Sequence, residues 1–428
     1  MLISTNIMNQ SALTLVTPIL NGFESNVDSF LSQIRKGLDS GTFVLFDEIG
    51  TIHYARFVIL KDQLSNGKAN LVFSSDYDGS QEEHLIKLAG SASAMLDDLY
   101  QFCEGYPAVT ERNTGTRKAF LSTWVVKEAS FYIGAPGRTV QQIKKESDLR
   151  NYIWNILNKG SWSGKSASDV FKMVKQEVLD NPGFSWVNDK IALPQVRWFG
   201  HPWAQILIAL LLLPFTLLVL IFVAIWILVI HFRYEKTDKP LGLTPSQIDE
   251  AKLKELEEYE DMHNQNQFTQ IVPMRPGKMR LYTLKALMLY ARFRVFSEFR
   301  LGKLMGIPTI HFARWVIFDN NKQVLFFSNF DGSWQQYLGD FIDKSGWGLT
   351  AIFSNTKDFP KTRFLFFGGA YDEEHFLAWA RYTQVPTAVW YCAYPHLSIK
   401  NINNNSAIRY GLMQNFSDQE AQNFLNRF

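Results

Sequence analysis

The chain contains TIHYARFVI at residues 51–59 and TIHFARWVI at residues 309–317. Seven of the nine positions are identical, and the other two exchange one aromatic residue for another. Similar blocks recur in the same order elsewhere, at spacings longer than the roughly 20–50 residues of solenoid repeats. The sequence therefore predicts two copies of one domain-sized unit. The other matched pairs are 13–19 with 268–274, 73–80 with 326–333, and 131–136 with 390–395.

Each copy has the residue pattern of a βαββαβ unit. In the first copy, Ser80 and Glu83 are spaced as a capping box, which marks the start of the second helix. This order of elements is ferredoxin-like, with helices on one face of an antiparallel sheet. From apolar spacing and alternation we expect strands at 13–19, 51–60 and 70–77, a helix at 24–38, and a further strand or strand pair at 120–134.

The second copy repeats this order and adds a helix near 371–382 and a strand at 387–394. Each sheet has one uncovered face, which the other half can cover. The expected fold class is α+β, with two tandem ferredoxin-like βαββαβ halves forming a pseudo-dimeric α/β barrel and an apolar membrane helix or hairpin between them. The expected domains are a first half at 1–195, a membrane segment at 203–230, a polar tether helix at 232–264, and a second half at 265–428.

The segment from Trp203 to Ile230 has 28 residues and no charge. About 20 apolar residues suffice to cross a bilayer as a helix, so this segment is expected in a membrane rather than in a protein core. It could be one tilted span or a hairpin that bends near Pro214. Packing of the two halves against each other requires them to share one side of the membrane, which favours the hairpin.

The first residues of the chain and its two cysteines indicate where the protein is located in the cell. The first twenty residues lack the pattern of a secretory signal peptide. Cys103 and Cys392 are the only cysteines, and two isolated thiols fit a reducing compartment. We expect an inner or cytoplasmic membrane protein whose soluble halves face the cytoplasm.

The distribution of charge bears on two classes of partner, nucleic acids and membrane lipids. The 43 basic and 41 acidic residues nearly cancel, which argues against a nucleic-acid partner. Between Arg275 and Lys303, however, eight basic residues accompany a single acid, Glu298, interleaved with apolar residues. The pattern is typical of a helix that lies on membrane lipid with anionic headgroups, although a helix with a solvated basic face has it too. The residues expected at the membrane surface are Arg292, Arg294, Arg300 and Lys303.

Few polar residues occur in both copies, and these are the candidates for chemistry. Folding of each strand pair about its turn brings His53 close to Asp78, and His311 close to Asp331. A carboxylate on one imidazole nitrogen raises the basicity of the other, which suits a general base or an axial haem ligand. The alternative is ordinary turn and cap chemistry. The residues shared by the copies are His53/His311, Arg56/Arg314, Ser75/Ser328, Asp78/Asp331 and Gly79/Gly332.

Other candidates are separated from these pairs. Arg56 and Arg314 lie three residues beyond their histidines, so on a regular strand they point to the opposite face. His84, His375 and His396 have no partner at metal-ligand spacing and are expected on the surface, and no metal site is predicted.

In element order, duplication and an Asp-Gly after a strand, both halves resemble the dimeric α/β-barrel superfamily. Its haem-binding members include the dye-decolourising peroxidases and chlorite dismutases. The peroxidases carry a Gly-x-x-Asp-Gly motif with the acid beside the haem, and here Ser75 and Ser328 occupy the first glycine position. The resemblance implies haem as a candidate cofactor but supplies no clearly matched proximal histidine. His311 is the first candidate ligand, because it has an expected carboxylate partner. The catalytic candidates are then His311, Asp331, Arg314, His53, Asp78 and Arg56.

Two functions from different classes follow. One is a membrane-anchored α/β-barrel protein that binds a lipid, a small ligand or a protein partner. The other is a membrane-associated, haem-dependent oxidoreductase of peroxidase type. No nucleophile motif or phosphate-binding glycine loop decides whether the chain is an enzyme. Substrate and oligomeric state do not follow from the sequence.

Overall fold

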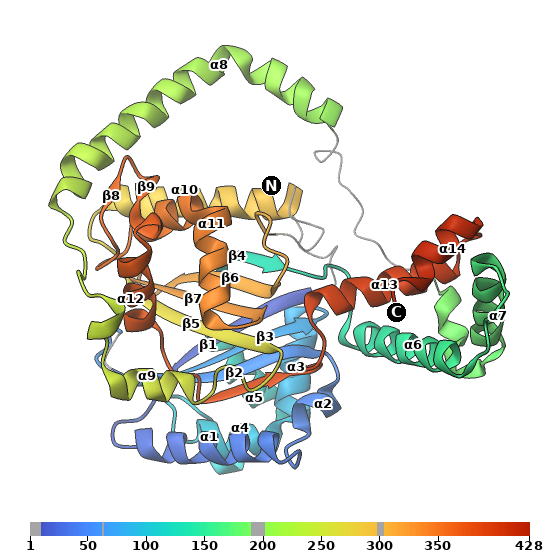
Figure 1. The fold of residues 1–428 in the computed structure, drawn as a ribbon. Coiled ribbons are helices and arrows are strands. Elements are labelled where there is room, and N and C mark those ends of the chain that lie inside the picture. The colour runs from blue at the N-terminus through green and yellow to red at the C-terminus, as the bar shows by residue number, and fades with distance from the viewer. Residues whose placement is uncertain (1–9, 62–63, 190–201, 298–303) are drawn as a thin grey trace.

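The computed structural model describes residues 10–61, 64–189, 202–297 and 304–428. The fold is a mixed α+β arrangement in which two four-stranded antiparallel sheets lie at the centre, with helices on their outer sides (Figure 1). The strand order is β1-β3-β2-β10 in the first sheet and β4-β6-β7-β5 in the second. The first sheet consists of β1 (Gln10–Pro18), β2 (Ile52–Leu60), β3 (Asn70–Asp78) and β10 (Val389–Cys392), and the second of β4 (Glu128–Ile133), β5 (Gln265–Pro273), β6 (Ile310–Phe318) and β7 (Gln323–Asp331).

The short edge strands are exchanged between the halves. β10, from the end of the chain, pairs with β2, so that Tyr391 lies opposite Ala55. β4, from the first half, pairs with β6, so that Tyr132 lies opposite Ala313. In a self-contained ferredoxin-like half, the last strand would complete its own sheet. Here each sheet instead depends on hydrogen bonds from the other half.

The remaining strands have matching registers in the two halves. Gln10 lies opposite Asp78 in the first sheet, and Gln265 lies opposite Asp331 in the second. In both halves the β2–β3 or β6–β7 ladder shifts register at the histidine, between Ile52 and Tyr54 and between Ile310 and Phe312. A bulge of this kind adds an unpaired residue and redirects its side chain. Both histidines occupy such a position.

Helices cover the outer face of each sheet. On the first sheet, Val27 and Leu31 of the expected helix enter one core with Leu88 and Leu99. On the second sheet, Phe341 and Trp379 lie in a separate core. The helices of the first half are α1 (Glu24–Asp39), α2 (Leu45–Ile49), α3 (Gln81–Ser91), α4 (Ser93–Tyr100), η1 (Val109–Glu111) and α5 (Thr114–Thr123), and those of the second are α10 (Lys278–Ser297), α11 (Trp334–Phe353), η7 (Gly369–Tyr371) and α12 (Glu373–Thr383).

Most expected elements are present, including the capping box of Ser80 and Glu83. The strand expected at 120–134 is partly wrong, because its first residues end helix α5 and only β4 is extended. Asn113 and Thr116 form a capping box at the start of α5, which fixes that helix. The strand expected at 387–394 is the shorter β10.

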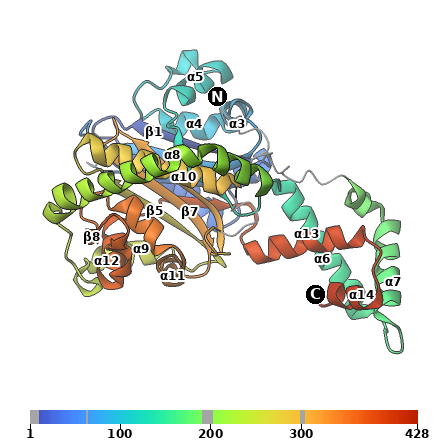
Figure 2. The ribbon, with the colours of Figure 1, turned by 90° about the horizontal axis from the view of Figure 1, so that it is seen from above.

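A helical arm extends from one side of the sheets (Figures 1 and 2). It has its own apolar core, in which Leu149 and Ile153 pack with Ile408 and Phe424. α6 continues from the end of β4 and α13 from the end of β10, so the exchanged strands bring the two helices together. The arm consists of α6 (Val140–Lys159), α7 (Ala167–Asp180), η2 (Pro182–Asn188), α13 (Ile399–Leu412) and α14 (Asp418–Leu425).

The polar connector before β5 is folded against the second half. Glu260 is buried, and its carboxylate lies 2.6 Å from Arg381 of α12. Within the tether helix expected at 232–264, the α-helix α9 begins only at Glu250, where Asp249 provides the cap. The connector contains η6 (Pro245–Gln247) and α9 (Glu250–Glu257).

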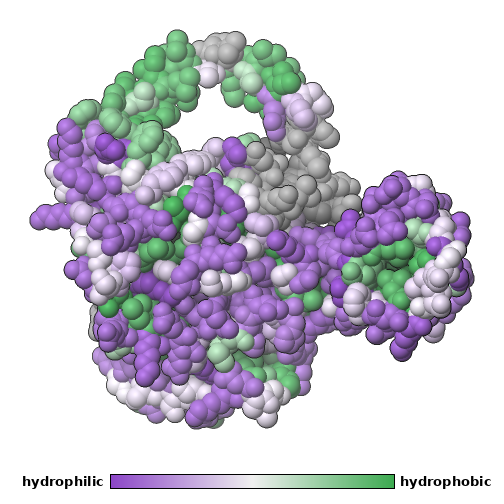
Figure 3. Space-filling model, viewed as in Figure 1, coloured by the Kyte–Doolittle hydropathy of each residue, from purple (hydrophilic) through white to green (hydrophobic). Residues whose placement is uncertain are grey.

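The apolar segment forms α8 (Pro202–Val229), followed by η4 (Ile230–Tyr234) and η5 (Glu235–Thr237). The helix bends as an arch over the molecule, and Pro214 within it removes a backbone donor, which accounts for such a bend (Figure 1). The second part of α8 together with η4 and η5 forms one stretch, Thr216–Thr237, that is long and apolar enough to cross a membrane. Leu211 is 68% exposed and Leu218 66%, so α8 is not a core helix, and the arch forms an apolar surface (Figure 3).

We predict that the two halves stay together when the chain is cut between them. A protease recognition sequence is inserted after residue 195, and the detergent-purified protein is cleaved. The fragments should co-elute in size-exclusion chromatography, because β4 and β10 are each hydrogen-bonded into the sheet of the other fragment. They should separate in denaturant. Separation under native conditions would contradict the strand exchange.

Candidate functional site

In the first half, the predicted His–Asp contact joins the sheet to the helical arm. His53 Nε2 lies 3.0 Å from Asp78 Oδ1. The other carboxylate oxygen, Asp78 Oδ2, accepts a hydrogen bond of 2.8 Å from the backbone N–H of Val140, the first residue of α6. A helix N-terminus has unsatisfied N–H groups and favours negative charge, so Asp78 stabilises the start of α6.

The second half has the same arrangement. His311 Nε2 lies 2.7 Å from Asp331 Oδ1, and Asp331 Oδ2 accepts a hydrogen bond of 2.8 Å from the N–H of Ile399, the first residue of α13. Each pair therefore attaches one arm helix to the sheet. This contact is the turn and cap chemistry that the sequence left open beside catalysis.

Two glutamines complete these attachments, and sequence analysis missed them. The Gln10 side chain donates to Arg138 O at 2.8 Å and accepts from the N–H of Gly137, in the loop before α6. Gln265 donates to Tyr394 O at 3.0 Å, before α13. Extending the match between residues 13–19 and 268–274 three positions upstream aligns the two glutamines, and this signal could have identified them.

The two histidines differ in the partner of the second ring nitrogen. A carboxylate only accepts, so each ring donates from Nε2, and a neutral ring then accepts at Nδ1. His53 Nδ1 lies 2.8 Å from the hydroxyl of Tyr394. His311 Nδ1 is buried and has no hydrogen-bond partner among the described residues. In the repeat, Ala135 corresponds to Tyr394, which explains why no hydroxyl reaches His311.

The surroundings of His311 do not fit an axial haem ligand. Its Nε2 bonds to Asp331, its side chain is 1% exposed, and its ring packs against Tyr54 and Tyr394 at centroid distances of 5.7 and 6.3 Å. A haem ligand needs a free nitrogen facing space for a macrocycle. The cavity of about 620 Å³ beside α8 includes neither His311 nor His53 in its lining. We therefore derive no haem chemistry, and the catalytic roles of the six candidates remain predictions.

The shared arginines lie at a different place, between the two sheets. Arg56 of β2 crosses to the second sheet and donates to Phe268 O at 2.9 Å and to Ser328 O at 3.0 Å. Arg314 of β6 crosses the other way and donates to Ser75 O at 3.1 Å. Both side chains are buried. They contribute to the contact between the sheets, and they do not share the environment of the histidines, as expected.

Asp76 is the carboxylate nearest to this arginine pair. It lies 3.5 Å from Arg314 Nη1 and accepts a hydrogen bond of 3.0 Å from Asn329, its equivalent in the second half. Burial raises the pKa of Asp76 above its ordinary value, and the nearby guanidinium groups oppose that shift. Burial also lowers the pKa of Arg56 to about 9. Desolvation is thus the dominant effect on both groups.

Of the remaining histidines, His84 was predicted wrongly. It is buried, stacks on Tyr77 at a centroid distance of 3.7 Å, and lies 2.9 Å from Ser75 Oγ. Burial lowers the pKa of His84 to about 3, so the ring is neutral at physiological pH. His396 is exposed, and His375 lies near the surface beside Asp372.

Of the residues expected at the membrane surface, Arg292 is exposed on α10. Arg294 is half-buried and donates to the Tyr290 hydroxyl at 2.9 Å. Arg300 and Lys303 lie outside the described residues. Only part of the predicted basic surface is therefore located.

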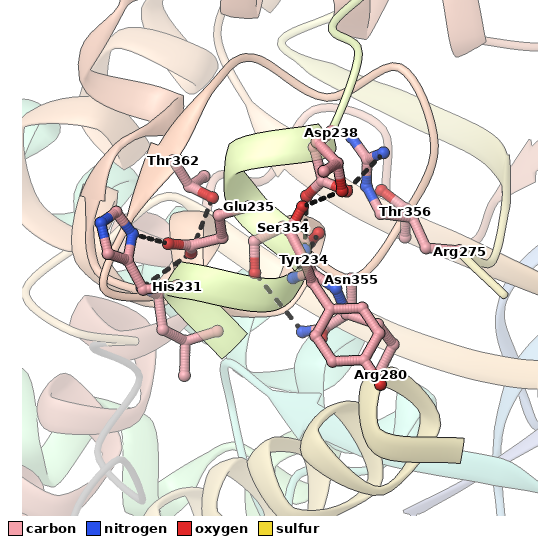
Figure 4. A network of polar contacts seen from close by, with 12 residues as sticks. His231, Tyr234, Glu235, Asp238, Arg275, Arg280, Ser354, Asn355, Thr356 and Thr362 are labelled. Carbon is pink, nitrogen blue, oxygen red and sulfur yellow. Dashed lines mark hydrogen bonds and ion pairs between the residues drawn. The ribbon is translucent and has the colours of Figure 1, made fainter. Parts of the chain in front are cut away.

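Two other basic residues of this stretch fix the end of α8 (Figure 4). Arg275 lies 3.0 Å from Asp238, and Arg280 forms an ion pair with the same carboxylate. Next to them, Glu235 is buried, contacts His231 at 2.8 Å, and accepts from the N–H of Leu365 at 2.9 Å. These contacts tie the end of α8 to α10 and to a hairpin formed by β8 (Thr362–Arg363) and β9 (Phe367–Gly368).

Comparison with protein families, with characterised proteins and with solved structures finds no significant match for this chain. Within the described residues, no group of three or more His, Cys, Asp or Glu side chains is placed to hold a metal ion. Any assignment of function therefore rests on the geometry of this chain.

We predict that the buried His–Asp contact stabilises the fold and that an exposed one does not. Asp331→Asn should lower the free energy of unfolding by about 1–3 kcal/mol, because the amide cannot accept from both His311 and the N–H of Ile399. Urea denaturation measures the loss, and hydrogen exchange should increase at the start of α13.

The matched control is Asp372→Asn, which removes a surface pair with His375 at 2.8 Å, close to the 2.7 Å between His311 and Asp331. Exposed pairs contribute little, so its effect should stay within about 0.5 kcal/mol. Equal losses in the two variants would contradict the role of Asp331 as an attachment point.

The raised pKa of Asp76 predicts a pH dependence with a defined sign. The folded state holds this proton more tightly than the unfolded state, so Asp76 favours folding at pH below its unfolded pKa of about 3.9, and this contribution is lost as pH rises through the folded pKa. The stability of the unmodified protein relative to Asp76→Asn should therefore fall as pH rises from 4, by at most about 1.4 kcal/mol per pH unit.

Asp97→Asn provides a control of opposite sign. Asp97 accepts from Arg117 at 2.6 and 2.8 Å, and these hydrogen bonds lower the pKa of Asp97. The advantage of the unmodified protein over this variant should increase with pH through the acid range. Urea denaturation between about pH 2 and 8 measures both variants, because the change at Asp97 lies below its unfolded pKa of about 3.9. Parallel curves would refute the assignment for Asp76.

Proposed function

We propose that this chain is a membrane-anchored α/β-barrel protein that binds membrane lipid, with α8 dipping into the bilayer and returning. The observation that carries the proposal is the exposed apolar arch of α8. This arch connects two halves of the chain that are joined through exchanged strands. The proposed barrel is the pair of stacked sheets, related by an internal duplication. Their matching registers and paired bulges support the duplication.

The exchanged strands support a re-entrant arrangement of α8. Because β10 pairs with β2 and β4 pairs with β6, the folded halves lie on one side of any membrane. A helix between them cannot cross completely and leave the chain on the far side. A bend at Pro214 allows it to enter the bilayer and return.

Transfer of α8 into lipid removes a large apolar surface from water. Leu211 and Leu218 are among many side chains of α8 that are more than half exposed. Burying a side chain of this kind stabilises by about 1.5–3 kcal/mol. Within the described window only 6% of the helix residues are buried by the protein itself, so lipid is the fitting environment.

Helix α10 adds an interfacial surface. Lys278, Lys285 and Arg292 are exposed and seven residues apart, so they lie along one line of the helix. Exposed Tyr282 and Leu289 follow the neighbouring line. Cations beside aromatic and aliphatic side chains are typical of helices at anionic membrane surfaces.

The β8–β9 hairpin lies at the same end of the molecule as α8 and α10 (Figure 1). Its turn contains the apolar run Phe364–Phe367, and Phe367 is 61% exposed. An exposed apolar patch of this kind marks an interaction site. Together the arch, the helix and the hairpin turn form the proposed membrane face, with the soluble halves on the cytoplasmic side.

We predict that neutralising the basic line of α10 weakens binding to anionic vesicles. Each cation near the surface contributes about 1 kcal/mol, so replacing Lys278, Lys285 and Arg292 by Gln should reduce the partition coefficient about 100-fold. Flotation with vesicles of phosphatidylglycerol and phosphatidylcholine measures this, and the loss should shrink at high salt.

The control is a triple variant with the same change of charge outside the proposed membrane face. Lys87 on α3, Lys172 on α7 and Lys400 on α13 are exposed and suit this purpose. Their replacement by Gln should leave vesicle binding within about twofold. Equal effects of the two triple variants would show that only net charge matters and would reject α10 as the contact.

A further inference from the structure

A cavity of about 620 Å³ lies between α8 and the rest of the proposed membrane face. We infer that it takes one acyl chain of an anionic bilayer phospholipid. This inference rests on the proposed function and specifies its ligand. The volume falls within the range of about 300–1,000 Å³ typical of small-molecule sites.

The walls of the cavity are apolar and come from separate parts of the chain. Phe222, Val223 and Trp226 contribute from α8, Tyr282 and Ala286 from α10, and Trp347 from α11. These elements are held together by the polar contacts at the end of α8 (Figure 4). The cavity thus has a defined position beside the second sheet, with a third of its lining residues supplied by α8.

Two polar groups of the wall, the Trp226 indole N–H and the Thr283 hydroxyl, are already hydrogen-bonded. Trp226 Nε1 donates to Thr283 Oγ1 at 2.9 Å, and Thr283 Oγ1 donates to Met279 O at 2.8 Å. No hydrogen bond from a ligand is needed there, so a hydrocarbon chain suits the site better than a polar molecule.

A smaller apolar cavity of about 70 Å³ adjoins the first one beside α10. The two share Leu287, Tyr290 and Trp347, and the smaller one extends to Met305 and Phe341. A narrow apolar extension of a wider groove fits a linear chain. It does not fit the bulk of a partner helix, which is about 10–12 Å wide with its side chains.

The cavity is continuous with the surface that would lie in lipid. Figure 3 shows the opening between the arch of α8 and the body of the molecule. On α10, Tyr282 lines the cavity and is also next to the line of Lys278 and Lys285. A chain inside the cavity can therefore belong to a lipid whose anionic headgroup contacts these lysines. Charge complementarity thus identifies the phospholipid.

The test is photolabelling of the full-length protein in vesicles that contain a trace of phosphatidylglycerol with a diazirine in the middle of one chain. After irradiation, mass spectrometry of proteolytic peptides should locate adducts on Trp226, Tyr290 and their neighbours, enriched at least fivefold over the opposite face of α8 at Ile221 and Leu228. Labelling spread evenly along α8 would overturn the inference, because it would report only immersion in lipid.

Filling the cavity provides the decisive comparison. Ala286→Trp places a large side chain in the opening from α10, and Val223→Trp does so from α8. Each should reduce the cavity adducts at least fivefold, whereas Val109→Trp, on exposed η1 outside the lining, should not. Circular dichroism and vesicle flotation verify that the variants fold and still bind. Unchanged labelling in both folded, vesicle-bound variants would refute the site.

Two further labelled compounds test whether the ligand is an anionic phospholipid. A diazirine-labelled free fatty acid and a labelled phosphatidylcholine should label the cavity at least threefold less than phosphatidylglycerol, and equal labelling would overturn the assignment to an anionic phospholipid. If the unmodified protein does not float with vesicles, the proposed membrane function fails. If it floats but the cavity is unlabelled, only the present inference fails.

Discussion

The exchange of β4 and β10 is the constraint on which the rest of this structure depends. These two strands are short, yet each closes one edge of the sheet that belongs to the other half. The exchange makes neither half complete alone and places both on one side of any membrane. It also places the segments that follow β4 and β10 next to each other. As a result, α6 and α13 pack together and form the base of the helical arm.

Packing the two sheets together buries charged side chains between them, which costs free energy of desolvation. Arg56 and Arg314 are both buried there, and Asp76 is the nearest carboxylate. Desolvation of these charges opposes folding, and the many hydrogen bonds to backbone carbonyls offset it. Because each guanidinium reaches only one set of carbonyls on the opposite sheet, the pair also fixes how the sheets face each other. Asn329 in place of a second aspartate spares the interior another buried charge.

Sequence patterns predicted the local structure well and the pairing of distant strands poorly. The residue pattern identifies a strand such as 51–59, and the turn between β2 and β3 determines that Asp78 lies near His53. Nothing in β4 identifies β6 as its neighbour, because edge pairing depends on long-range packing. His84 illustrates a similar limit. Its position on a helix suggested exposure, yet that face of α3 packs on Tyr77.

Of the candidate site, only the two His–Asp contacts could be predicted from the sequence. The repeat located both His–Asp pairs, but their partners Val140 and Ile399 lie far along the chain, so the attachment of the arm helices could not be seen. The residue pattern of the pairs fits a base and a cap equally well. The structure shows the cap, because one oxygen of each carboxylate accepts a hydrogen bond from the first N–H of an arm helix, and the role of the histidines as a base stays a prediction.

The end of α8 explains how an exposed helix can have a defined direction. An apolar helix on its own has no preferred angle to a soluble domain, since lipid contacts are the same on all sides. At this junction Glu235 and Asp238 are held by donors from three segments, the start of α10, the hairpin and His231. Charged groups with little exposure tolerate few geometries. A change in the angle of α8 would break several of these contacts together, so the junction sets the spacing between α8 and α10.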